Sequence, residues 1–216
     1  MTASYYRDDI PALHVSTLHS SSLLLQKNFD GVFSAETIER FLLTSYDEFA
    51  GRLGNDTYLP MFAERFARER LTALAKVEGK SDDHRPLVLF LCTHNAGRSQ
   101  MALGFFKEMA GDSAIAWSGG SEPGNAVNAA AIAAMAEVGI DISGEFPKPW
   151  TDEIVRAADV VITMGGGDAC PIFPGKRYED WQVTDPAGLT VDDVRPIRDD
   201  IRDRVAGLLS VLNVAV

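Results

Sequence analysis

Residues 86–99 read Pro86-Leu87-Val88-Leu89-Phe90-Leu91-Cys92-Thr93-His94-Asn95-Ala96-Gly97-Arg98-Ser99, and this stretch decides the fold. Its apolar first half is typical of a buried β-strand. The residues that follow it, 100–109, have the composition of an α-helix. A strand that passes through a tight loop into a helix indicates an α/β sheet, in which such a loop lies at the carboxyl end of its strand.

The loop between strand and helix has the pattern Cys-x5-Arg-Ser, which begins at Cys92. A loop this short curls back on itself, so its backbone N–H groups can point at one oxyanion, and the helix N-terminus adds partial positive charge. Arg98 can hold two oxygens of that anion. The same groups favour the thiolate form of Cys92. A buried cysteine at a strand end is the alternative, but the full pattern favours an oxyanion loop with a cysteine nucleophile.

The residues around Cys92 have separate expected roles. Gly97 supplies backbone freedom beside the anion, and Asn95 tolerates a left-handed conformation. Ser99 can donate a hydrogen bond to the thiolate, whereas His94 is expected at the rim, pointing outward. Cys92 and His94 are too few ligands for zinc, so neither a metal nor another cofactor is predicted. The predicted oxyanion-binding residues are Thr93, His94, Asn95, Ala96, Gly97, Arg98 and Ser99.

The composition indicates a globular protein with an acidic surface. Of the 216 residues 46% are hydrophobic, which is enough for a full core, and the net charge is −11. Nucleic acid and anionic membranes attract basic surfaces, so neither is a predicted partner. No apolar run has the length of a signal peptide or a membrane span. Two cysteines without an export signal indicate thiol chemistry in the cytoplasm.

The chain divides near residue 80 into two predicted domains, 1–80 and 86–216, joined by a polar linker. In the first domain, residues 1–12 form a loose arm, and apolar spacing predicts helices over 15–28, after the N-cap Ser34, and over 59–77. Three such helices suggest a small antiparallel bundle. A core of about 65 residues is marginal, so the bundle is expected to lean on the second domain or on a second subunit in a homodimer.

The second domain alternates predicted strands and helices. Strands are expected at residues 87–91, 114–117 and 159–164. Helices are expected at residues 100–109 and 125–138, and a short one is expected to begin at residue 154. A final helix is expected to begin at Pro196 and to run to residue 212. The alternation implies a parallel sheet covered by helices on both faces. Sites in such sheets gather at the carboxyl ends of strands, where Cys92 and the segment after Met164 both lie.

The segment after Met164 contains the second cysteine. Gly165-Gly166-Gly167 predicts a mobile loop at the same edge as Cys92, and Cys170 follows it. A structural cysteine beside a turn proline is the alternative. Because both cysteines stand at functional positions, a redox partnership is favoured. The glycines also suggest a nucleotide loop, but no Gly-Lys-Ser/Thr follows them.

Asp185 is the candidate general acid. It precedes Pro186 on a loop expected to return to the same sheet edge. When a thiolate attacks a tetrahedral oxyanion, the departing oxygen needs a proton. Asp-Pro is also a common turn, so the local sequence leaves both interpretations open. The other nearby acids are interpreted as loop or cap residues: Asp168, Asp180, Asp192 and Asp193.

Residues 86–216 resemble the low-molecular-weight protein tyrosine phosphatase superfamily, and within it the arsenate reductases of bacterial type. The motifs that carry the resemblance are residues 92–102, Gly119-Gly120-Ser121-Glu122-Pro123, residues 135–142 and Thr184-Asp185-Pro186-Ala187. The resemblance implies a four-stranded parallel sheet flanked by helices, with Cys92 as nucleophile, Arg98 as oxyanion ligand and Asp185 as general acid. The N-terminal module is similar to one attached to some actinobacterial reductases.

The resemblance implies reduction of arsenate to arsenite, started by attack of Cys92 on arsenate. If Cys170 is the second thiol, a Cys92–Cys170 disulfide then forms and thioredoxin resets it. Thioredoxin-coupled relatives usually carry a further cysteine where this chain has Gly165-Gly166-Gly167. Cys170 therefore acts directly, or mycothiol with mycoredoxin replaces the missing thiol, or reduction is impaired.

Two other functions are compatible with the same loop. The first is phosphomonoester hydrolysis, because phosphate and arsenate are nearly isosteric. Phosphatases of the superfamily usually carry a cysteine where Gly97 stands and aromatic residues where Ala187 stands, and both absences favour the reductase. The second is a non-enzymatic sensor of arsenic or phosphate that signals through the helical bundle.

Overall fold

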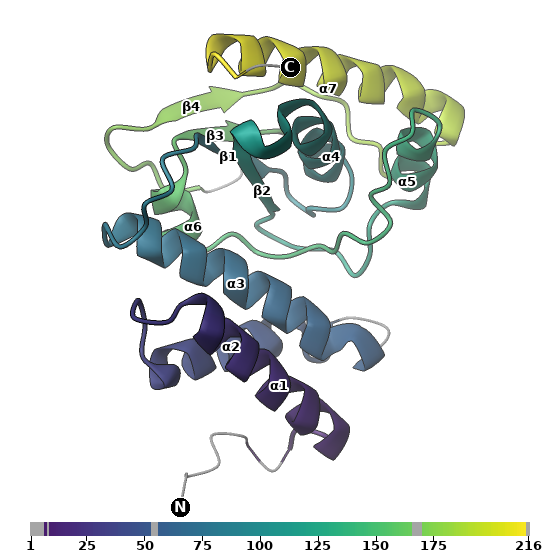
Figure 1. Ribbon diagram of the computed structural model, residues 1–216. Coiled ribbons are helices and arrows are strands. Elements are labelled where there is room, and N and C mark those ends of the chain that lie inside the picture. Colours follow the sequence, from purple (N-terminus) through teal and green to yellow (C-terminus); the bar gives the residue numbers. More distant parts are fainter. Residues whose placement is uncertain (1–6, 8, 53–55, 166–169, 215–216) are drawn as a thin grey trace, which may run out of the picture. The chain divides into compact units, whose positions relative to one another are not determined.

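The computed structural model describes residues 7, 9–52, 56–165 and 170–214. The chain forms two compact units, residues 1–82 and residues 83–216 (Figure 1). The first unit is helical, and the second contains the sheet.

The first unit consists of helices α1 (Ala12–Asn28), α2 (Ala35–Phe49) and α3 (Leu59–Val77), with a 3-10 turn at Asp56–Tyr58. Its core is apolar, and the rings of Phe49 and Phe66 meet edge to face, with centroids 5.7 Å apart. Ser34 caps α2 as predicted, because its hydroxyl oxygen accepts the backbone N–H of Thr37. The three predicted helices are therefore confirmed.

Helix α1 begins at Ala12, three residues earlier than the apolar spacing predicted. His14 explains the difference, because its Nδ1 lies 2.8 Å from the hydroxyl oxygen of Tyr46 on α2. Both side chains are buried, so this polar contact holds a turn of α1 in which no apolar periodicity was visible.

The second unit is built on a four-stranded parallel sheet in the order β2-β1-β3-β4. Its strands are β1 (Leu87–Leu91), β2 (Ile115–Gly119), β3 (Val160–Thr163) and β4 (Arg177–Asp180). All five residues of β1 are buried, as expected of a central strand. The predicted parallel α/β sheet is confirmed. Strand β4 was not predicted, because its residues show no apolar pattern. Asp180 therefore belongs to an edge strand, and its interpretation as a loop or cap residue was wrong.

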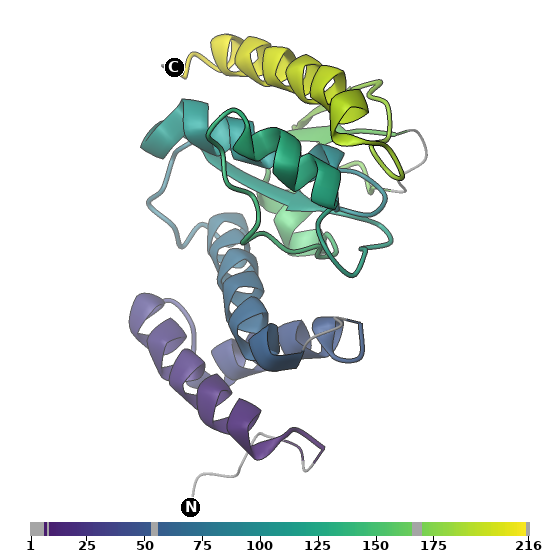
Figure 2. The same cartoon turned by 90° about the vertical axis from the view of Figure 1, so that its right-hand side faces the viewer.

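Helices cover both faces of this sheet. The helices are α4 (Arg98–Ala110), α5 (Ala129–Ala136), α6 (Asp152–Ala157) and α7 (Val191–Val211), with a 3-10 turn at Gly111–Ser113. Val88 and Phe90 share one core with α4, α5 and α7, and both views show α7 beside α4 and α5 (Figures 1 and 2). Helix α6 contacts β1, and its buried residues Ile154 and Val155 lie outside that core.

Helices α5 and α7 begin at other residues than expected, and caps explain both differences. Helix α5 begins at Ala129 rather than at residue 125, because the Asn128 side chain accepts the backbone N–H of Ala131 and ends the preceding loop. Helix α7 begins at Val191 rather than at Pro196, because Thr190 caps it through the N–H of Asp193. Pro196 is accommodated inside the helix.

Candidate functional site

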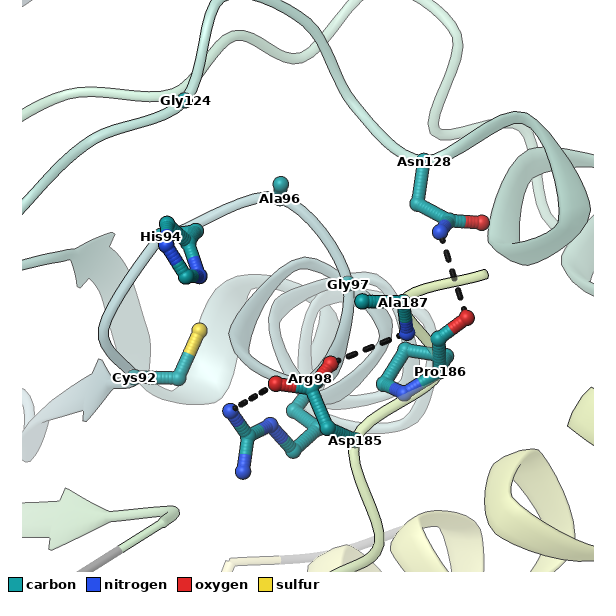
Figure 3. A pocket seen from close by; sticks show the side chains of 10 residues that line it. All are labelled: Cys92, His94, Ala96, Gly97, Arg98, Gly124, Asn128, Asp185, Pro186 and Ala187. Atoms are coloured by element: carbon teal, nitrogen blue, oxygen red, sulfur yellow. Dashed lines mark hydrogen bonds and ion pairs between the residues drawn. The ribbon is translucent and has the colours of Figure 1, made fainter. Parts of the chain in front are cut away.

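A cavity of about 290 Å³ lies at the carboxyl end of β1 (Figure 3). It joins two segments that are far apart in the chain: the anion loop, residues 92–99, and the acid loop, residues 183–187. The residues that line the cavity are Cys92, His94, Ala96, Gly97, Arg98, Gly124, Asn128, Asp185, Pro186 and Ala187. The three residues assigned to the chemistry, Cys92, Arg98 and Asp185, therefore share one cavity.

A hydrogen-bond relay within the anion loop places a proton donor beside the sulfur of Cys92. Asn95 has the left-handed φ of 47° that was expected, and its Oδ1 accepts the backbone N–H of Lys148 at 3.0 Å. The Nδ2 of Asn95 consequently donates to the hydroxyl oxygen of Ser99 at 2.8 Å. The one hydroxyl hydrogen of Ser99 is then left for the Sγ of Cys92, 3.0 Å away. This donor stabilises negative charge on the sulfur.

Replacing Ser99 with alanine is expected to slow alkylation of Cys92 by iodoacetamide at neutral pH about tenfold, because the thiolate loses a donor worth about 1–2 kcal/mol. Ser118→Ala is the matched control. Ser118 is equally buried, and its hydroxyl oxygen has no hydrogen-bond partner among the described residues. Equal alkylation rates in the two variants would contradict the relay.

Arg98 is the first residue of α4, and its side chain is buried beside the acid loop. Its Nη2 lies 2.8 Å from Oδ2 of Asp185, and its Nη1 donates to the carbonyl oxygen of Val183 at 3.4 Å. The other carboxylate oxygen of Asp185 accepts the backbone N–H of Ala187. The side chain of Asp185 is 47% exposed, so it can exchange protons with water. The predicted oxyanion ligand, Arg98, and the predicted general acid, Asp185, thus lie in contact.

Two glycines make room for this arrangement. A Cβ on Gly97 would lie 2.5 Å from Cγ of Pro186, which brings the acid loop against the anion loop. The absence of a side chain at residue 97 is therefore required for space. Gly165, two residues after the end of β3, has a φ of +108°, and a Cβ there would meet the guanidinium of Arg98 at Nη1. The guanidinium therefore occupies the space that a side chain at residue 165 would need.

Gly165→Ala is expected to weaken phosphate binding about tenfold or more, because the new methyl group displaces the Arg98 fork. Gly175→Ala is the control for backbone strain, since Gly175 also has a positive φ, +81°, and a Cβ there meets no described atom within 4 Å. Titration calorimetry with phosphate measures both. Gly175→Ala should lower the stability of the protein and leave its affinity for phosphate unchanged. Equal phosphate affinities in the two variants would contradict the role of Arg98 as the oxyanion ligand.

The remaining predicted residues take different places. His94 is exposed and lines the cavity, in keeping with a rim position, and Ala96 also lines it. Asn95 and Ser99 are fully buried, outside the cavity lining, and act through the relay. Thr93 is outside the lining too, and its carbonyl oxygen accepts the N–H of Glu122.

Cys170 does not line the cavity. It is half-buried, and its Sγ lies 3.7 Å from the carbonyl oxygen of Pro171, which also accepts the hydroxyl of Tyr178 on β4. Both cysteines are thiols rather than a disulfide. The expected mobile loop at Gly166 and Gly167, like the interpretation of Asp168, lies outside the described residues.

Asn128 and Gly124 are cavity residues that the sequence analysis missed. Asn128 was assigned to the interior of a helix, although an asparagine before an alanine-rich run is a typical N-cap signal. In the described part of the chain, no group of three or more His, Cys, Asp or Glu side chains is placed to hold a metal ion. None of the described helices is long and apolar enough to cross a membrane.

Comparisons with known proteins match both units of the chain. Residues 87–216 match the family described as low molecular weight phosphotyrosine protein phosphatase, and residues 18–75 match the one described as protein-tyrosine-phosphatase-like, N-terminal domain. Arsenate reductase 2 of Staphylococcus haemolyticus is 39% identical over 121 residues, which cover 55% of this chain and 92% of that protein.

Solved structures show the same likeness. A thioredoxin-dependent arsenate reductase of Corynebacterium glutamicum is 41% identical, with a TM-score of 0.81, and the match covers 93% of this chain and 98% of that one. An arsenate reductase in the phosphate binding state is 36% identical, with a TM-score of 0.52 over 58% of this chain and 97% of that one. The first of these relatives is similar along nearly its whole length.

Proposed function

This chain belongs to the low molecular weight phosphotyrosine protein phosphatase family, and we propose that it reduces arsenate to arsenite at Cys92. The observation that carries the proposal is the meeting of Arg98, Asp185 and a hydrogen-bonded Cys92 sulfur around one small cavity. Its relatives in Staphylococcus haemolyticus and Corynebacterium glutamicum are named arsenate reductases, which supports arsenate as the substrate.

The first step joins sulfur to arsenic. The anion loop and Arg98 hold the arsenate oxygens, and the Cys92 thiolate attacks arsenic and forms an S–As bond. Asp185 gives its proton to the departing oxygen, which leaves as water. When the anion binds, Arg98 exchanges its ion pair with Asp185 for an ion pair with the anion. The guanidinium therefore has a negatively charged partner whether or not the cavity is occupied.

The second step transfers two electrons. The thiolate of Cys170 attacks the Sγ of Cys92, the S–S bond forms, the S–As bond breaks, and its electron pair reduces As(V) to As(III). Arsenite leaves. The dithiol of thioredoxin then reduces the Cys92–Cys170 disulfide and is itself oxidised to a disulfide. Because Cys170 lies outside the cavity lining, its segment has to approach Cys92 for this step.

The cavity wall favours a small oxyanion over an aryl phosphate. Among the described residues that line it there is no phenylalanine, tyrosine or tryptophan, and Ala96, Gly124 and Ala187 offer no ring for stacking. Hydrolysis of phosphomonoesters is therefore the second candidate, supported only by the shared geometry of phosphate and arsenate.

Arsenate-dependent oxidation of NADPH, with thioredoxin and thioredoxin reductase, tests the proposed function. The wild-type protein should consume NADPH with arsenate and not with phosphate. Release of p-nitrophenol from p-nitrophenyl phosphate, measured beside it, tests the alternative. Fast hydrolysis without arsenate-dependent NADPH consumption would contradict the proposal.

Cys170→Ser separates the two sources of the second thiol. If Cys170 resolves Cys92, the variant should lose thioredoxin-coupled turnover by at least about 10³-fold, because no disulfide can form within the chain. The same variant assayed with mycothiol and mycoredoxin is the control. Wild-type activity of the variant with mycothiol, together with an inactive wild type with thioredoxin, would place the second thiol outside the chain.

The organisation of the whole protein is part of the same proposal. We assign reduction to the domain at residues 86–216 and self-association, as a homodimer, to the helical module at residues 1–80. Leu13, Leu23 and Leu24 of α1 are 75%, 55% and 48% exposed, which suits a helix surface that a second copy could cover.

A further inference from the structure

We propose that Asn128 positions the acid loop for proton transfer from Asp185, an inference that rests on the function proposed above. Asn128 lines the same cavity as Cys92 and Asp185 and directly precedes α5 (Figure 3). It belongs neither to the anion loop nor to the acid loop, and it bonds to both.

Three hydrogen bonds place Asn128 between three elements. Its backbone N–H donates to the carbonyl oxygen of Ala96 in the anion loop at 2.8 Å. Its Oδ1 accepts the N–H of Ala131 at 2.9 Å, which caps α5. Because a backbone N–H fixes this oxygen, the amide nitrogen is the atom that faces the acid loop, and Nδ2 donates to the carbonyl oxygen of Pro186 at 3.3 Å. One side chain thus ties the acid loop to a capped helix.

The other side-chain hydrogen bonds that reach the described acid loop from elsewhere come from Arg98, to Asp185 and to the carbonyl oxygen of Val183. An oxyanion in the cavity competes for the same guanidinium. Proton transfer to the departing oxygen also requires Asp185 to carry a proton, and a neutral carboxyl group forms no ion pair with the guanidinium. The hold of Arg98 on the loop is therefore weakest when the proton is to be transferred.

The hydrogen bond from Asn128 to Pro186 depends neither on the oxyanion nor on the charge of Asp185. It joins two neutral groups, so it persists whether or not the anion is bound and whether or not Asp185 carries its proton. It also holds Pro186 beside Gly97, where the acid loop and the anion loop approach so closely that a Cβ on Gly97 would lie 2.5 Å from Cγ of Pro186. Asn128 thus fixes the distance of the acid from the reacting oxygen.

Two substitutions at residue 128 separate positioning from capping. Asn128→Ser keeps a good N-cap oxygen but is too short to reach Pro186, whereas Asn128→Ala loses both functions. Both variants should lower kcat for arsenate about tenfold with an unchanged KM, because a loop displaced by a fraction of an ångström misplaces the acid. If the serine variant behaves like the wild type while the alanine variant is impaired, Asn128 only caps α5 and the proposal is overturned.

A double variant tests whether Asn128 acts through Asp185. Asn128→Ser should lower kcat in the wild-type background and change nothing further in the Asp185→Asn background, since there is no acid left to position. An equal loss in both backgrounds, which a general structural role would produce, would overturn the proposal.

Hydrogen exchange keeps the proposal testable even if arsenate is not the substrate. With phosphate bound, the N–H groups of Ala187 and Leu189, which bond to Asp185 and Pro186, should exchange faster in Asn128→Ser than in the wild type. Unchanged exchange would overturn the inference about Asn128. Absence of arsenate-dependent NADPH oxidation in the wild type would instead count against the proposed function.

Discussion

Cys92→Ser is expected to abolish arsenate reduction, with kcat lowered by at least about 10⁴-fold. A serine hydroxyl stays protonated at neutral pH, so the relay through Ser99 has no anion to stabilise. It also cannot form a disulfide, so the electron transfer fails even if arsenate binds. Arsenate-dependent NADPH oxidation measures the loss.

Phosphate binding shows whether the cavity of the Cys92→Ser variant is intact. Arg98 and the backbone of the anion loop are unchanged in this variant, so phosphate should bind about as tightly as in the wild type. Residual turnover above about a hundredth of the wild-type rate would show that Cys92 is not the nucleophile.

Arg98→Lys is expected to lower kcat/KM for arsenate by about 10²- to 10³-fold, although the charge is kept. The planar fork of Arg98 reaches both the carboxylate of Asp185 and the carbonyl oxygen of Val183. A lysine ammonium offers a single point charge, which cannot hold two oxygens of an anion in the same geometry.

Arg202→Lys is the control for the loss of any arginine, because Arg202 is an exposed α7 residue that pairs with Asp199 and Asp203. It should leave both kcat and KM unchanged, since exposed ion pairs contribute little. An Arg98→Lys variant with wild-type kcat/KM would contradict the role of the guanidinium fork.

The sequence predicts the centre of the fold because its signals there are local. Residues 87–91 are apolar throughout, and a helix follows them after six residues, so β1, the anion loop and α4 could be placed directly. Strand β4 could not, because Arg177-Tyr178-Glu179-Asp180 is a short, polar edge strand. It is a strand only because its backbone pairs with β3, and backbone pairing leaves no pattern in the side chains from which it could be predicted.

The candidate site divides in the same way. Cys92, Arg98 and Asp185 could be proposed because their loops follow predictable strands or carry a motif. Gly165 and Asn128 matter through contacts with residues 98 and 186, which lie 67 and 58 positions away in the chain. The space that Gly165 leaves for Arg98, and the hydrogen bond from the Asn128 amide to Pro186, depend on distances that exist only in the folded chain.

A single-turnover experiment tests the central claim most directly. Fully reduced protein is mixed with arsenate without any external reductant, and both arsenite and the mass of the chain are measured. The two-thiol mechanism predicts roughly one arsenite per chain, a mass loss of about 2 Da and a peptide that links Cys92 to Cys170. No arsenite and an unchanged mass would contradict it.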